Sequence, residues 1–193
     1  MTAQRTVGGG IILMYHRIST ALPDPFSLNV TPAHFAEHLA VLRRWREPMH
    51  LREMLRQSSH DRRHLKPVAI TFDDGYLDNY SDAMPLLTAF GVPGTFFVPT
   101  GILSGEREFM WDELEQILLG ANSLPRWLRM TIGADVFDFD LGIDAVYRLE
   151  DADRHRYWTV DSGALPTARH ALFRRLHWRL RTEPFVIVTV QVL

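Results

Sequence analysis

Two adjacent carboxylates, Asp73 and Asp74, directly follow the apolar segment 68–72 and are followed by Gly75. Acids at the end of a buried strand can bind a divalent metal ion or take a proton from water, and α/β proteins place active sites at strand ends. Successive strand side chains point to opposite faces, so both acids can serve one site only if the chain leaves extended geometry here. Gly75, which tolerates positive φ, would permit such a turn. Taken alone, Asp-Asp-Gly is more typical of an ordinary turn, so the surrounding sequence decides its meaning.

The segments around these acids predict a strand, a helix and a second strand. Residues 68–72 favour a buried strand, and residues 78–90 show a helical pattern. Gly91 occupies the position of a left-handed helix cap, and residues 95–98 favour a second buried strand. Strand, helix and strand in about 30 residues form a βαβ unit, whose strands should be parallel. We therefore expect an α/β fold.

The sequence before this unit predicts another strand and two helices. Residues 11–15 favour a first strand. Thr31 is a helix-capping residue, and Pro32 suits the first position of the helix that it begins. A shorter helix is expected around residues 51–55.

The sequence after this unit predicts a helix, a β-hairpin, a second helix and a strand. The corresponding segments are residues 111–119, 128–141, 167–181 and 186–193. Thr167 is expected to cap the second helix, and we interpret the arginines at 174, 175, 179 and 181 as its solvated face. The last segment is strongly β-prone, and an apolar strand left unpaired would be an aggregation hazard.

Composition narrows the class of protein. The chain has 193 residues, of which 46% are hydrophobic, so it can form a single domain with a sizeable core. Its 21 basic and 23 acidic residues give a net charge of −2, which favours neither nucleic acid nor an anionic membrane as a partner. It has no cysteine, so any metal ion must be bound by His, Asp, Glu or water. No apolar run approaches the roughly 18 residues of a membrane span, and residues 11–15 lack a leader cleavage site, so we expect a cytoplasmic location.

Three blocks in this order, residues 13–17, 71–75 and 91–98, resemble the polysaccharide deacetylase family, also called the NodB-homology or carbohydrate esterase family. Residues 109–114 are similar to a subgroup that carries an insertion. The likeness is good over residues 11–119. It implies the front part of a distorted (β/α) barrel with parallel strands in one incomplete domain, residues 1–193. Residues 120–182 would then be an inserted β-hairpin and helical segment, and residues 183–193 an unrelated-looking tail.

The resemblance also implies a reaction and roles for the two acids. It implies metal-dependent hydrolysis of the acetamide of an N-acetylated sugar or polysaccharide, by a hydrolase of non-peptide C–N bonds. Asp73 would be the general base, and Asp74 would bind a divalent ion, Zn²⁺ or a similar metal. This chemistry is sensible, since a bound divalent ion lowers the pKa of its water and a nearby carboxylate can take the proton.

The sequence departs from the family after Asp74. The family adds a His-x-x-x-His motif that completes the metal site, then an Arg-Pro motif and a late Leu-x-His. The downstream histidines are only His155, His170 and His177, and no two are four residues apart. The chain therefore looks like the front part of a longer enzyme, and we expect it to bind metal weakly and to show little or no activity.

Other residues near the motif have two interpretations each. His16 follows the first strand and should lie near Asp73, as a substrate or supporting contact or as an ordinary hydrogen-bonded histidine. Tyr76 could contact substrate. Asp78 and Asn79 could do the same, but capping of the next helix explains them equally well.

Two histidine pairs have the i, i+4 spacing of zinc ligands, His34 with His38 and His60 with His64. Both precede the acidic motif, and we interpret them as a solvated helix face and an exposed loop. Two alternatives to a working deacetylase remain. One is a non-catalytic remnant or sugar-binding module of the same fold. The other, an Asp-x-Asp phosphatase, is disfavoured because the acids are adjacent. The oligomeric state and the particular sugar stay open.

Overall fold

The protein is described by a computed structural model that places residues 10–56, 66–102, 108–181 and 188–192. The chain divides into two compact units, residues 1–20 with 28–103 and residues 21–27 with 104–193. The single-domain organisation stays a prediction. No helix in the described part of the chain has both the length and the apolar character of a membrane span.

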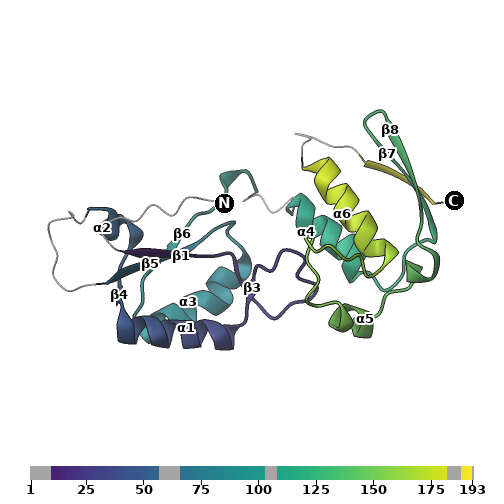
Figure 1. The fold of residues 1–193 in the computed structure, drawn as a ribbon. Coiled ribbons are helices and arrows are strands. Elements are labelled where there is room, and N and C mark those ends of the chain that lie inside the picture. The colour runs from purple at the N-terminus through teal and green to yellow at the C-terminus, as the bar shows by residue number, and fades with distance from the viewer. Residues whose placement is uncertain (1–9, 57–65, 103–107, 182–187, 193) are drawn as a thin grey trace. The chain divides into compact units, whose positions relative to one another are not determined.

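The first unit is built on a small parallel sheet in which β5 is central (Figure 1). Its strands are β1 (Ile11–Tyr15), β4 (Glu47–Pro48), β5 (Pro67–Phe72) and β6 (Gly94–Phe96). Each of the other strands pairs with β5 in parallel, with Tyr15 opposite Phe72 and Phe72 opposite Phe96. The predicted α/β class and the parallel βαβ unit are therefore confirmed. A second, two-stranded parallel sheet joins β2 (Arg17–Ile18) to β3 (Asn29–Val30).

Helices cover both faces of this sheet. They are α1 (Pro32–Trp45), α2 (Leu51–Arg56), the π-helix η1 (Asn79–Ala83), α3 (Met84–Phe90) and the 3-10 turn η2 (Thr100–Ile102). Phe35 and Leu39 of α1 and Leu87 of α3 pack with Phe72 on one face, whereas Met54 of α2 packs on the other. The hydroxyl of Thr31 accepts a hydrogen bond from the His34 backbone, so the predicted cap is confirmed. Gly91, at φ 60°, ends α3 as expected.

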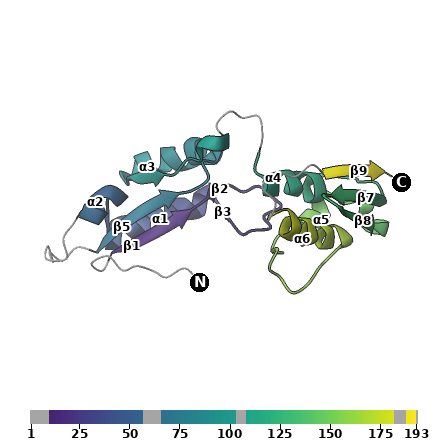
Figure 2. The ribbon, with the colours of Figure 1, turned by 90° about the horizontal axis from the view of Figure 1, so that it is seen from above.

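The second unit is a three-stranded antiparallel sheet packed against helices (Figure 2). Its elements are α4 (Met110–Glu115), η3 (Gln116–Gly120), β7 (Trp127–Ile132), β8 (Asp135–Asp140), η4 (Gly142–Ala145), α5 (Leu149–Arg154), α6 (Ala168–Leu180) and β9 (Val188–Val192). The predicted hairpin is confirmed as β7 and β8, and the expected C-terminal strand is confirmed as β9, which pairs with the other edge of β7.

Alternating residues of β7 form one wall of the core in this unit. Leu128, Met130 and Ile132 are buried and pack in one cluster with apolar residues of α6 and η3. Burial of every second residue is the pattern expected of a sheet with one covered face.

Arg169 crosses this core and is fully buried. Its guanidinium donates hydrogen bonds to the backbone carbonyls of Leu118, Ala121, Asp144 and Ala145. A buried charge is tolerated only when its donors are satisfied, and here the donors satisfy carbonyls of η3, η4 and the adjoining loop. One side chain of α6 therefore bonds both to the segment before β7 and to the segment after β8.

Candidate active site

The acidic pair lies where β5 ends. Phe72 is the last residue of the strand, and the backbone N–H of Asp73 donates to the carbonyl of Tyr15, the last residue of β1, at 3.0 Å. Asp73 therefore continues the parallel pairing for one step. Because parallel strands end at the same edge, this pairing presents the Asp73 carboxylate at the sheet edge predicted from the sequence.

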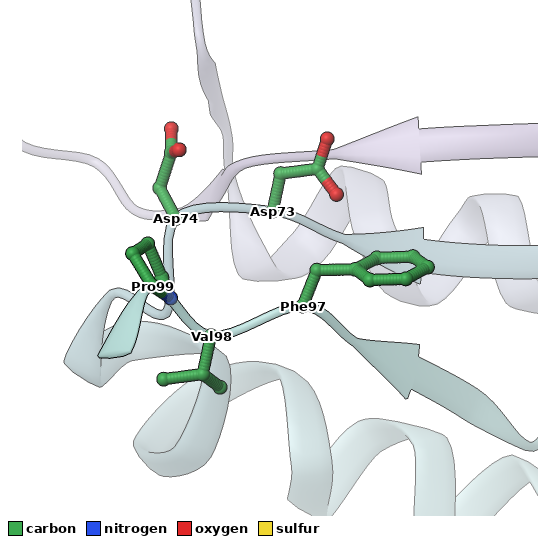
Figure 3. Close-up of a pocket in the computed structure, with 5 residues that line it drawn as sticks. All are labelled: Asp73, Asp74, Phe97, Val98 and Pro99. Carbon is green, nitrogen blue, oxygen red and sulfur yellow. The ribbon is translucent and has the colours of Figure 1, made fainter. Parts of the chain in front are cut away.

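The chain leaves extended geometry at Asp74 and Gly75, and the positive φ expected of Gly75 is confirmed. Asp74 has φ 67° and Gly75 has φ 66°. Asp tolerates the left-handed region better than most residues, because its short polar side chain can bond locally. The turn is why two consecutive acids project to the same side of the loop (Figure 3).

The two acids line an open pocket of about 550 Å³ together with Phe97, Val98 and Pro99. The three apolar residues directly follow β6. The Phe97 backbone N–H donates to the Phe72 carbonyl at 2.8 Å, and this hydrogen bond holds the ends of β5 and β6 beside one another. Val98 is directed away from the carboxylates in Figure 3. The pocket thus joins two acids to a largely apolar wall.

The apolar wall was missed by the sequence analysis, in which residues 95–98 were assigned to a second buried strand. That prediction is wrong in extent and burial, because β6 ends at Phe96, which is itself 40% exposed. Phe97 and Val98 are half exposed, and they follow β6 as the acids follow β5. That shared position at the ends of neighbouring parallel strands was the available signal.

His16 lies beside the acidic pair, as its place after the first strand predicts. Its Nε2 atom is 4.0 Å from Oδ2 of Asp74, and the two side chains are 22% and 28% exposed. Both groups are therefore accessible from solvent and close enough to share a ligand. A role in substrate binding stays a prediction for His16.

Tyr76 is half-buried and is not among the five residues that line the pocket. The Arg17 guanidinium lies over its ring at 4.6 Å from the centroid, the geometry of a cation–π contact. The predicted substrate contact of Tyr76 stays a prediction, and the structure shows it packed against a strand residue.

The expectation that Asp78 caps the next helix is wrong. Asp78 precedes η1 but makes no side-chain capping bond. Its carboxylate instead accepts hydrogen bonds from Arg17 Nε at 3.0 Å and from the Ile18 backbone N–H at 3.1 Å. The Asp78 carboxylate bonds to the Arg17 guanidinium, some sixty residues away in the chain, and not to the backbone N–H groups of the nearby helix end. The reason is that a hydrogen bond between two charged groups is stronger than one to a neutral N–H.

Asn79, the other capping candidate, is buried and begins η1 itself. With its amide oriented so that both ends find suitable partners, the NH₂ group donates to the His16 carbonyl at 2.9 Å. Asn79 therefore also bonds to His16 itself, which lies between β1 and β2.

The described residues do not by themselves make a zinc site. No group of three or more His, Cys, Asp or Glu side chains that could hold a metal ion occurs among them. Near the pocket, Asp74 and His16 are two possible metal ligands, with Nε2 of His16 lying 4.0 Å from Oδ2 of Asp74. A structural or catalytic zinc ion needs three or four protein ligands.

Of the two histidine pairs, the one within the described residues, His34 and His38, is not part of a metal-binding group. In the first pair, Nδ1 of His38 shares a 3.1 Å hydrogen bond with the Tyr15 hydroxyl, and burial raises the pKa of that hydroxyl. His34 is exposed on the same helix, as expected of a solvated face. The other pair, His60 and His64, lies outside the described residues.

Comparisons with known proteins find one family that is similar to the segment around Asp73 and Asp74. Residues 60–120 match the family model for polysaccharide deacetylase. A curated Bacillus subtilis protein named "Putative polysaccharide deacetylase YxkH" is 40% identical over 91 residues, which are 45% of this chain and 30% of that protein. The chain thus spans less than a third of this relative's length.

Two solved structures are similar to part of the chain. A structure of IcaB from Ammonifex degensii matches 57% of this chain and 48% of its own at 25% identity, with a TM-score of 0.46. The Streptococcus pyogenes deacetylase PplD, solved with acetate, matches 55% and 50% at 26% identity, with a TM-score of 0.44. The sequence matches show that the part of the chain that contains Asp73 and Asp74 is similar to the polysaccharide deacetylase family.

Proposed function

We propose that this chain contributes the general base and one metal ligand to a carbohydrate N-deacetylase. The reaction is hydrolysis of the acetamide of an N-acetylated sugar or polysaccharide. The observation that carries the proposal is the placement of two consecutive acids, Asp73 and Asp74, on one side of a turn at an open pocket. Their occurrence in a segment that matches polysaccharide deacetylases supports the choice of substrate class.

Asp73 is the proposed base. It is partly exposed in the pocket and its backbone is fixed by the bond to Tyr15. In this position its carboxylate can take a proton from the water molecule that attacks the acetamide carbonyl carbon. The proton later returns to the leaving nitrogen, so that acetate and a free amine are the products.

The apolar side of the pocket supports an acetamide substrate. Phe97 and Pro99, which line the pocket with the acids, supply carbon atoms to this side. Such a wall suits the acetyl methyl group and the apolar face of a sugar ring, while the carboxylates address the polar amide.

Metal dependence is also part of the proposal, with Asp74 as the ligand that this chain contributes and Zn²⁺ as the expected ion. The two donors near the pocket are too few for tight binding. We therefore keep the expectation of weak zinc affinity and low turnover for the chain by itself.

A second candidate, favoured by this small donor set, is a sugar-binding module without catalysis. The experiment that separates the two adds N-acetylglucosamine oligomers and Zn²⁺ to the protein. Acetate release is followed by a coupled assay, and sugar binding by NMR shift changes. The variants are Asp73→Asn and Asp74→Ala, with Asp82→Asn as the control because that acid bonds only locally to Ser81.

An N-deacetylase releases acetate slowly, loses this activity with either pocket variant and keeps it with the control. A binding module shows sugar-induced shifts at the pocket, unchanged by Asp74→Ala, and no acetate release by any variant. Absence of both release and binding contradicts the proposed substrate class. Stoichiometric zinc binding at neutral pH with rapid acetate release would overturn only the expectation of weak activity.

A further inference from the structure

We infer that Asp78 is a positioning residue, which fixes His16 against Asp74 through the backbone and side chain of β2. The inference deepens the proposed function, because it concerns the support of the same site. It rests on a set of contacts between residues 15–18 and residues 73–79, two segments that are far apart in the sequence.

The first contacts of this set belong to Asp78. One carboxylate oxygen accepts from the Ile18 backbone N–H and the other from Arg17 Nε. The Asp78 and Arg17 side chains are only 12% and 26% exposed, so water competes weakly for this ion pair. A charge-assisted bond in such a partly buried place holds its partners in a defined geometry.

Further contacts come from the residues on either side of His16 and from its own backbone. The Tyr15 carbonyl accepts from Asp73, and the His16 carbonyl accepts from Asn79 in the orientation described above. Each of the four residues from 15 to 18 is therefore bonded to the segment that carries the acids. The imidazole of His16 is left with its Nε2 atom 4.0 Å from the Asp74 carboxylate.

Asp78 differs from Asp73 because its bonds are made by a side chain, and from Asn79 because that side chain is a carboxylate paired with an arginine. Backbone pairing of β1 with β5 already aligns Tyr15 and Phe72, and it survives substitution of Asp78. What such a substitution removes is the anchor of Arg17 and Ile18, directly after His16. The pairing with β3 and the buried Ile18 side chain still hold β2, but two of its bonds to the segment that carries the acids are lost, so the imidazole can shift away from Asp74.

The arrangement also determines where the Arg17 charge lies. The guanidinium is held between the Asp78 carboxylate and the Tyr76 ring. Its ion pair is therefore with Asp78, and His16 is the basic group with an ion-pair distance to the pocket acid Asp74. Loss of Asp78 would leave a partly buried arginine without this carboxylate.

The test measures the position of His16 by NMR on the full chain. Nuclear Overhauser effects between the His16 ring protons and Asp74 Hβ report their proximity, without metal or substrate. Asp78→Ala should reduce these signals at least fivefold, whereas Asp78→Glu should restore part of them. Asp82→Ala is the matched control on the same segment and should leave them unchanged. Signals between the Tyr15 and Phe72 rings, which stack at 5.7 Å, report that the core is retained.

If Asp78→Ala fails to fold, the isosteric Asp78→Asn variant replaces it. This variant lacks the charge that pairs with Arg17, and it should reduce the His16 signals at least twofold. The inference is overturned if a folded variant at Asp78 keeps the full His16 to Asp74 signal, or if the control loses the signal equally. Absent acetate release, by contrast, bears only on the proposed function.

Discussion

Acid should destabilise the second unit through His170, a residue of α6. This side chain is only 2% exposed, and its Nδ1 atom lies 2.7 Å from the Thr167 hydroxyl. The Trp158 and His155 rings contact it edge-on, at centroid distances of 4.5 and 5.1 Å. Burial is the main reason that the pKa of His170 falls from 6.5 to about 4.

The charged groups around His170 modify this effect. His155 and Arg169 further lower its pKa, whereas Asp144 raises it. Asp144 is engaged elsewhere, since its carboxylate accepts from the Ala168 backbone N–H at 2.7 Å. Asp144 therefore offsets only part of the cost of protonating the buried ring.

The lowered pKa sets the direction of the pH dependence. Above pH 6.5 the ring is neutral in both the folded and the unfolded state, and its contribution to stability is fully retained. As the pH falls from 6.5 towards 4, the unfolded chain binds a proton that the folded one does not. With pKa values of 6.5 and about 4, the free energy of unfolding should fall by at most about 2.5 kcal/mol between pH 7 and pH 4.5.

Urea denaturation at pH 7 and pH 4.5, followed by the fluorescence of Trp158 and the other tryptophans, measures this loss. His170→Asn removes the titrating group but keeps a polar atom near Thr167. The variant should lose less stability than the parent protein between these two pH values, with a difference of about 2 kcal/mol. Surface acids are present in both proteins, so their titration cancels in the comparison. Equal losses in parent and variant would refute the reasoning.

Two further substitutions test the buried arginine and the motif turn. Arg169→Lys should lower the free energy of unfolding by at least about 3 kcal/mol, because several buried carbonyls lose their donors, and urea titration should show little change for the exposed control Arg175→Lys. Gly75→Ala should cost about 1–2 kcal/mol, since φ is 66° and the new Cβ would lie 3.1 Å from Val98 Cγ1. Gly163→Ala, which meets no atom within 4 Å, should shift the melting temperature far less, and equal shifts would contradict the strain argument.

Short-range patterns predicted most of the elements. A capping hydroxyl followed by proline predicted the start of α1 at Thr31, and a glycine after an apolar stripe predicted the end of α3 at Gly91. Alternation around Gly133 predicted the hairpin of β7 and β8. These features depend on neighbours within a few residues, so a single sequence contains the information that fixes them.

Residues with distant partners were interpreted less well. Asp78 was expected to cap the helix that follows it, but its partner is Arg17, which lies in the distant strand β2. The arginines from Arg174 onwards were interpreted as surface groups of α6 because of their charge. No sequence feature distinguished Arg169, in the same helix, as buried. Its acceptors are backbone carbonyls of separate segments, which leave no trace in side-chain patterns.

The sequence by itself determined the acidic motif, its strand and the family that this segment resembles, because these follow from residue types at fixed local spacing. Only the tertiary structure decided that Asp74 adopts a left-handed conformation, that both acids face one pocket, and that His16 reaches one of them. It also supplied the apolar wall at Phe97. The physical reason is that a site at a sheet edge is formed by the ends of several strands, and their pairing depends on contacts between distant segments.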